Sequence, residues 1–172
     1  MTDYEVADFA DPIGFIYTEH ERIRSQWDAL LLLADAPDAA AAAGIARALV
    51  DFLADDLPKH VADEEADMFP LLEARALPDD GIRPVLALLR AEHREDVELG
   101  GPLARPLEAI AAGAQLPEPE LFRAYARAVV TLQRRHHLLE NNVVLPLAFD
   151  RFDDADMADL GRRFAARRAV DA

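Results

Sequence analysis

The chain has 172 residues, of which 52% are apolar, and it carries a formal net charge of −15 and no cysteine. This length suits one domain with a single sizeable core, spanning residues 1–172. The negative charge argues against nucleic acid and anionic membranes as partners, because both require clustered Lys and Arg. Without cysteine, disulfides, thiolate zinc sites and iron–sulfur clusters are excluded, so a metal here must use His, Asp, Glu or water.

The N-terminus and the hydropathy of the chain bear on its location. The first residues are acidic and include no apolar signal segment, and no apolar run approaches the length of a membrane span. We therefore expect a cytoplasmic protein.

Abundant alanine and leucine, with few β-branched runs, predict an all-α fold. Asp11 followed by Pro12 has the capping residue and the first-turn proline of a helix start. Turn signals and prolines then place helices at about residues 11–34, 38–67, 82–99, 120–145 and 154–168. Because the connections are short, successive helices should be antiparallel. The expected fold is an up-down-up-down four-helix bundle with a short fifth C-terminal helix.

Prolines and glycines predict where these helices bend or end. Pro58 should kink the second helix, and Met68-Phe69-Pro70 should close it, with a last turn at Leu71 to Arg75 left open. Gly100-Gly101-Pro102 should break or kink the third helix, with a helical piece resuming to about residue 112. Pro146 should end the fourth helix.

Each long helix carries an apolar stripe at helical spacing that a histidine interrupts. These histidines are His20, His60, His93 and His136. A glutamate follows one turn after the second and the fourth of them, at Glu64 and Glu140, so each pair should point to the same side of its helix. The expected stripe of the fourth helix also includes Phe122, Tyr125, Val129, Leu132, Val143 and Leu147.

The two glutamates on the stripes point to a metal. A carboxylate buried in a bundle core costs on the order of several kcal/mol unless it is paired or binds a metal. The stripes include no lysine or arginine that could neutralise Glu64 and Glu140. Side chains that project inward from facing helices build two-metal carboxylate sites. Imidazole together with carboxylate suits iron, manganese or zinc and not calcium.

The chain also repeats itself. His60 and His136 are each followed by a glutamate four residues later and a proline ten residues later, and Glu19-His20 recurs as Glu92-His93. We interpret the domain as two pseudo-repeats, at about residues 11–75 and 82–150, followed by the C-terminal helix. Each repeat supplies one histidine and then one His-x-x-x-Glu motif.

These motifs resemble the hemerythrin-like HHE cation-binding family, over most of the chain from His20 to Pro146. The resemblance implies a hemerythrin-like bundle with two iron ions joined by an oxo or hydroxo bridge, with manganese or zinc as substitutes. It implies that Glu64 and Glu140 bridge the irons. His20 and His60 would then terminate one iron, and His93 and His136 the other.

Within this family, the pattern of four histidines and two glutamates is most similar to that of bacterial di-iron proteins proposed to repair iron centres. Val97 stands where oxygen-carrying relatives have a second histidine on the third helix. An open position on both irons would follow, and with it irreversible oxidation rather than reversible oxygen carriage. Those repair proteins often carry an N-terminal cysteine segment, which this chain lacks.

Three functions remain open at this point. The first is a di-iron protein that binds and reacts with oxygen, peroxide or nitric oxide, in oxidative or nitrosative stress. The second is an iron-sensing or iron-donating module without turnover, and the third is a metal-free structural bundle. Whether the protein is an enzyme, and which electron donor or protein partner it uses, is left open.

Several other residues are candidates for supporting roles. Glu92 is a candidate proton donor, and Glu19 should lie near the irons as its counterpart in the first repeat. His137 is expected beside the site or at the surface, and not among the ligands. The remaining expectations are a solvated Glu65, an imidazole- or water-binding Asp56, a core-packed Tyr17, and dipole-neutralising cations at Arg162, Arg163, Arg167 and Arg168.

Overall fold

A computed structural model describes residues 4–37 and 40–169, including their side chains except those of residues 6–7 and 96–101. The described part is helical and contains no strand. The α-helices are α1 (Pro12–Asp35), α2 (Ala42–Asp51), α3 (Leu57–Ala62), α4 (Phe69–Arg75), α5 (Ile82–Ala111), α6 (Pro119–Leu139), α7 (Leu145–Arg151) and α8 (Asp154–Arg167). Two 3₁₀ turns, η1 (Val6–Phe9) and η4 (Pro78–Asp80), precede α1 and α5.

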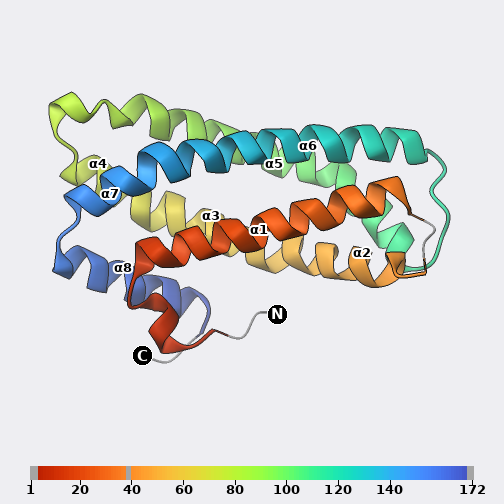
Figure 1. The fold of residues 1–172 in the computed structure, drawn as a ribbon, viewed down its shortest axis with the longest axis horizontal. Helices are drawn as coiled ribbons and strands as arrows, with labels where there is room; N and C mark the ends of the chain where they lie inside the picture. The colour runs from red at the N-terminus through yellow and green to blue at the C-terminus, as the bar shows by residue number, and fades with distance from the viewer. Residues whose placement is uncertain (1–3, 38–39, 170–172) are drawn as a thin grey trace.

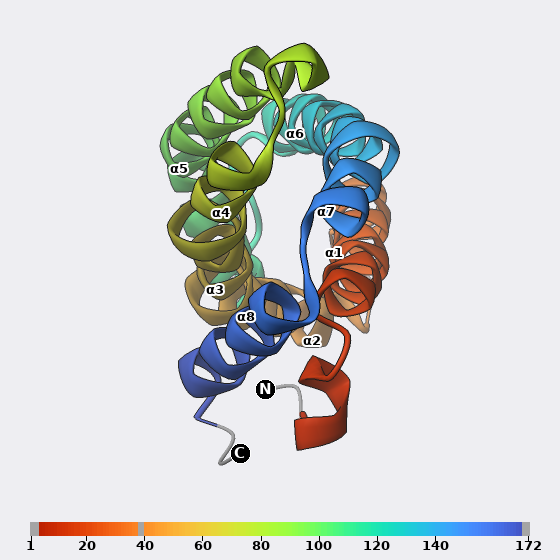
Figure 2. The same ribbon diagram turned by 90° about the vertical axis from the view of Figure 1, so that its left-hand side faces the viewer.

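The helices form the expected antiparallel four-helix bundle (Figure 1). One arm is α1, the second is α2 to α4, the third is α5, and the fourth is α6 with α7. Helix α1 packs against α2 and α6, and α5 packs against the same two neighbours, so the arms close a ring around the core. The view along the bundle in Figure 2 shows this ring, with α8 packed on its outside near one end, against α1.

Three π-helical segments join the shorter helices into continuous arms: η2 (Phe52–Asp56), η3 (Asp63–Met68) and η5 (Glu140–Val144). Each lies directly before a helix whose second residue is proline, namely Pro58, Pro70 or Pro146. Proline has no amide hydrogen and its ring crowds the carbonyl four residues back. The wider π turn accommodates the proline, because the preceding amide bonds to a carbonyl five residues back.

The predicted helix end at Pro146 is therefore wrong, since the fourth arm continues to Arg151. The second arm does not close at Phe69-Pro70 either, and the last turn that was left open as far as Arg75 is present. The expected break at Gly100-Gly101-Pro102 is also wrong, since the backbone of α5 passes through Pro102 without interruption. Beyond that proline, Leu103 and Leu107 are fully buried, and this packing outweighs the lost amide bond. The predicted bounds of the first and fifth helices are confirmed within one residue.

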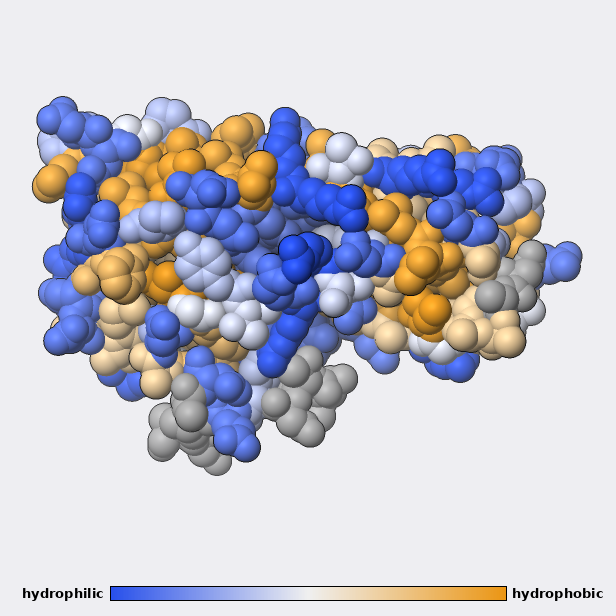
Figure 3. Space-filling view, in the orientation of Figure 1, coloured by the Kyte–Doolittle hydropathy of each residue, from blue (hydrophilic) through white to orange (hydrophobic). Residues whose placement is uncertain are grey.

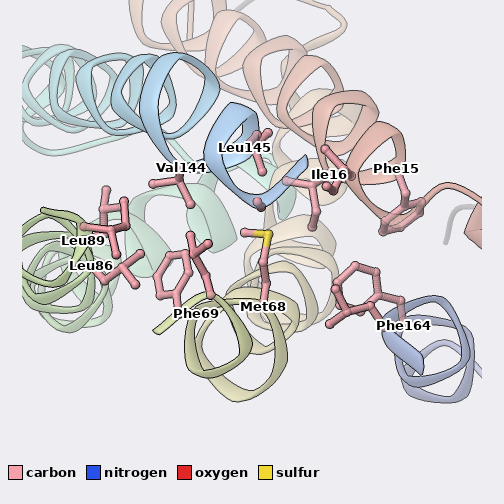
Figure 4. Packing of buried hydrophobic residues seen from close by; sticks show 14 of the residues in the cluster. Phe15, Ile16, Met68, Phe69, Leu86, Leu89, Val144, Leu145 and Phe164 are labelled. Atoms are coloured by element: carbon pink, nitrogen blue, oxygen red, sulfur yellow. The ribbon is translucent and has the colours of Figure 1, made fainter. Parts of the chain in front are cut away.

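Two apolar clusters fill the interior, one at each end of the bundle. The cluster in Figure 4 joins side chains from all four arms and from α8, among them Ile16, Phe69, Leu89, Val144 and Phe164. The other includes Ile23, Trp27, Leu30, Phe52 and Val129. Along α1, His20 lies between Ile16 of the first cluster and Ile23 of the second. The two clusters are thus separated by a layer of polar side chains at mid-bundle.

The C-terminal arginines bind a neighbouring segment and do not simply offset a helix dipole. Arg167 pairs with Asp63 and, at 2.6 Å, with Asp67. Arg168 is almost fully buried, lies 2.7 Å from Asp63 and stacks over the ring of Phe15. Both acids belong to the π-helical segment η3, so these ion pairs attach α8 to the segment that includes Glu64.

The face of the molecule formed by α1 and α6 is largely hydrophilic across its middle, with apolar residues on either side (Figure 3). Ion pairs join the two helices, including Arg134 to Asp28 at 2.7 Å and Arg127 to Asp35 at 3.0 Å. None of the helices in the described ranges has the length and apolar character of a membrane span.

Candidate metal centre

The six side chains predicted as ligands meet in the polar layer between the two apolar clusters. His20 comes from α1, His60 from α3, His93 from α5 and His136 from α6. Glu64 and Glu140 stand at or next to the start of π-helical segments η3 and η5. All six side chains are at most 5% exposed, so the whole set is shielded from solvent.

Glu64 contacts three of the histidines through its two oxygens. Its Oε1 lies 3.5 Å from Nε2 of His20 and 3.4 Å from Nε2 of His60. Its Oε2 lies 3.4 Å from Nε2 of His93. The carboxylate therefore spans two histidine groups, His20 with His60 on one side and His93 on the other.

Glu140 spans the same two groups. Its Oε2 lies 3.4 Å from Nε2 of His20, and its Oε1 lies 3.1 Å from Nε2 of His136. Nε2 of His93 and Nε2 of His136 are 3.0 Å apart. Neighbouring ligand atoms on one octahedral ion, each about 2.1 Å from it, are separated by about 3 Å. Each carboxylate therefore lies at about this spacing from histidines of both groups.

The polar atoms at the centre of this layer lack hydrogen-bond partners. Both oxygens of Glu64, both oxygens of Glu140 and Nε2 of His20 and of His60 are buried without one within the described residues. Leaving a buried carboxylate unsatisfied costs several kcal/mol in order of magnitude. A cation would satisfy these atoms together, and their imidazole and carboxylate chemistry fits iron, manganese or zinc.

The chain matches the model of the family described as hemerythrin HHE cation-binding domain over residues 11–148. It belongs to this family. The match covers all four arms of the bundle and each of the six side chains above. Searches among curated proteins and among solved structures gave no match. Membership in the hemerythrin family implies that the chain binds a cation, typically iron, and the cluster of histidine and glutamate fits that role.

In this hemerythrin domain, three of the ligand imidazoles are oriented by hydrogen bonds to their outer nitrogens. Nδ1 of His20 bonds to Oδ1 of Asn141 at 2.6 Å. Nδ1 of His93 bonds to Glu65 and Nδ1 of His136 to Glu92, each at 2.9 Å. A bond at Nδ1 fixes the ring and leaves Nε2 facing the centre.

Two of the acids therefore have different partners from those expected. Glu65 was expected in solvent, but it lies in the π-helical segment η3 and orients His93. Glu19 was expected to support the metal site, yet it is buried with other partners, bonding to Tyr4 and Arg22. The symmetry between Glu19 and Glu92 consequently fails. Asn141, which the sequence analysis missed, takes the place beside His20 that Glu19 was expected to fill.

The structure gives contacts for the other supporting candidates. Glu92 accepts hydrogen bonds at both oxygens, one from His136 and one from Arg135, so it holds the imidazole of His136 in place, and its role as a proton donor stays a prediction. Tyr17 is 38% exposed and donates to the carbonyl of Asn141 instead of packing in the core. Asp56 does not bond to Nδ1 of His60, which is buried without a partner in the described ranges.

His137 is a fifth histidine at the centre, where the sequence analysis expected four. Its side chain is only 8% exposed, and its ring stacks on that of His20 with centroids 4.5 Å apart. One ring nitrogen each from His20, His60 and His137 fall within 4.8 Å of one another. Adjacent residues on a helix point about 100° apart, so His136 and His137 face the two different histidine groups. Val97 has a side chain outside the described residues.

The five histidines fall into two groups, one with a lowered and one with a raised pKa. Burial lowers the pKa of His60 to about 3 and also holds the pKa of His137 well below its usual value. Burial opposes protonation of His136 as well, but contact with Glu140 outweighs it and raises that pKa to about 10. The pKa values of His20 and His93 are raised in the same way, against burial, by the nearby carboxylate of Glu64. Without metal, protons therefore remain inside the cluster.

The pKa values of the two carboxylates also shift in opposite directions. Burial works against the charge of Glu64, but the histidines around it, led by His60, hold its pKa well below the usual value. Burial together with the charge of Glu64 raises the pKa of Glu140. A divalent cation between them would stabilise both charges at once.

A cavity of about 520 Å³ ends at this centre. It lies between the second arm, α5 and α6, and four histidines form its inner end: His60, His93, His136 and His137. Its wall is mainly apolar, with Val50, Leu53, Leu57, Pro58 and Val61 on the second arm. The cavity gives small molecules a route to side chains that are otherwise buried.

Proposed function

We propose that the protein binds two iron ions at the polar layer and uses them to react with oxygen, peroxide or nitric oxide. The observation that carries this proposal is the set of buried, unpartnered oxygens of Glu64 and Glu140, each facing histidines from two groups. Six convergent ligand atoms are too many for one ion that also keeps a reactive position. Two bridging carboxylates account for the similar distances from each glutamate to both histidine groups.

The ligands divide between the two ions by their contacts. His93 and His136 serve one ion, and His20 and His60 serve the other, with Glu64 and Glu140 shared. The position of His137 adds a third imidazole to the His20 and His60 group. With His137 as a ligand, only the ion at His93 and His136 keeps an open position. The argument against reversible oxygen carriage, which required an open position on both ions, then no longer applies.

When bound, a pair of iron ions supplies one-electron and two-electron redox chemistry. The protein contributes by orienting and shielding. Asn141, Glu65 and Glu92 fix the imidazoles, and the two apolar clusters exclude water from the layer. The cavity admits a small reactant from one side. This division of tasks is consistent with a role in oxidative or nitrosative stress.

An iron donor or iron sensor is the alternative, and burial favours a retained cofactor over it. An ion released to a partner needs exposed or mobile ligands, whereas the six ligands predicted from the sequence are at most 5% exposed and His137 is 8% exposed. Three of them are also held by hydrogen bonds at their outer nitrogens.

Anaerobic reconstitution with ferrous iron, followed by mixing with each oxidant in a stopped-flow spectrometer, tests the proposal. We expect two irons per chain and an absorption change that is complete when both irons have been oxidised once. Iron that binds but stays unchanged on exposure to oxygen, peroxide and nitric oxide would support the donor or sensor instead. Protein that takes up no iron would leave only the structural bundle.

A further inference from the structure

The cavity at the centre is much larger than the reactants discussed so far require. Dioxygen and nitric oxide need a space comparable to that of one water molecule, about 30 Å³. The cavity measures about 520 Å³, which lies within the range of about 300–1,000 Å³ typical of pockets for organic ligands. A channel that only delivered diatomic molecules would not need this width.

The lining restricts the charge and polarity of an occupant. Apolar side chains form the wall, and the polar inner end consists of imidazoles. Glu108 lines the cavity and is solvent-exposed, so it places a negative charge toward the outside. No Lys or Arg belongs to the described lining, and the chain as a whole carries −15. An anion such as a fatty acid would therefore be repelled, whereas a neutral molecule with an apolar body is accepted.

We propose that the cavity binds a neutral organic hydroperoxide, with its apolar body against Leu53, Leu57 and Val61 and its peroxide group toward His93 and His136. This proposal rests on the proposed function and names the class of peroxide. The reaction balances in one turnover: the O–O bond breaks, and the products are an alcohol and water. Two ferrous ions supply the two electrons and become ferric, and two protons come from solvent.

The test compares two peroxides and two variants of α5. Ala104 lines the cavity, so Ala104→Phe should fill part of it. Ala87 is exposed on the same helix, so Ala87→Phe is a matched control. Di-ferrous protein is mixed with cumene hydroperoxide or with hydrogen peroxide, and the ratio of the two rates is measured. Calorimetry with the non-reacting alcohol 2-phenyl-2-propanol, on the iron-loaded protein, gives binding without turnover.

We expect the wild-type protein and Ala87→Phe to bind one alcohol molecule per chain and to react faster with cumene hydroperoxide than with hydrogen peroxide. Ala104→Phe should lower both the alcohol affinity and the rate ratio by at least about tenfold. Equal rates with both peroxides, or no saturable alcohol binding by the unchanged protein, would overturn the proposal even if Ala104→Phe failed to fold. If reconstitution loads no iron and the protein still binds the alcohol, the proposed function is rejected while the ligand class is retained.

Discussion

Asn141 and His20 stand 121 positions apart in the chain, yet Oδ1 of Asn141 lies 2.6 Å from Nδ1 of His20. An amide oxygen can only accept, so Nδ1 donates and Nε2 is left to face Glu64 and Glu140. Asn141 directly follows Glu140 in the π-helical segment η5. One turn therefore supplies both a bridging carboxylate and the group that orients a histidine of α1.

Replacing Asn141 should weaken the metal site. We expect Asn141→Ala to lower iron affinity by about 10–100-fold, because His20 loses the bond that fixes its ring. Competition with a ferrous chelator measures the change. The matched control is Asn142→Ala, since Asn142 is exposed and its side chain bonds only to the carbonyl of Leu138 among the described contacts. Equal losses in the two variants would contradict the role of Asn141.

Glu64 and Glu140 should matter more than any single histidine. Each carboxylate faces both histidine groups, so Glu64→Ala or Glu140→Ala should yield protein that loses both irons or holds an uncoupled pair. Glu65→Ala is the control, because Glu65 only orients His93, and it should keep a coupled pair at lower affinity. Mössbauer spectroscopy distinguishes these cases. A coupled pair in either bridging variant would show that the carboxylate does not bridge.

His137 should make the two irons different. With His137 bound, one iron has three imidazoles and the other has two, so two distinct quadrupole doublets are expected. In His137→Ala both irons have two imidazoles, and the doublets should converge while two irons per chain remain. Leu138→Ala, at an exposed neighbouring position, should leave both doublets unchanged. An unaltered spectrum in His137→Ala would mean that His137 does not bind iron.

Metal uptake should release protons at neutral pH. The pKa values of His20, His93 and His136 lie above the usual value, that of His136 at about 10, so these rings hold protons in the metal-free protein. Ligating imidazoles must be deprotonated, so binding expels those protons and affinity falls as pH decreases. Zinc titration in a weak buffer with a pH indicator measures this without iron oxidation. Zinc uptake without proton release at about pH 7 would contradict it.

The spacing of ligands and the capping signals were sufficient to predict the bundle and its polar layer. A histidine and a glutamate one turn apart, such as His60 and Glu64, share a face in a regular helix and still do so where the π turn begins. The Asp11 cap was predictable because its side chain accepts from Gly14 as such residues ordinarily do.

The π turns account for most of what the sequence analysis missed. Periodicity assumes 3.6 residues per turn, whereas each π segment adds residues and rotates the part of the helix beyond it. Val143, within η5, was expected in the core and is 39% exposed, while Val144 is buried. Leu132 was also expected in the core and is 38% exposed, while Gln133 is buried, but both lie in regular helix before η5, so the π turn does not explain them. A proline was taken to end its helix because the local sequence does not reveal the π turn that precedes it. His137 was expected beside the site or at the surface because the repeat matched His136, and not His137, to His60.

The measurement that tests the central claim most directly is an iron count combined with applied-field Mössbauer spectroscopy on oxidised, reconstituted protein. The claim is that Glu64 and Glu140 hold two bridged irons within one chain. It predicts two ferric ions per chain with a diamagnetic ground state, as antiferromagnetic coupling through a bridge requires. One iron per chain, or two irons with independent paramagnetic spectra, would contradict it.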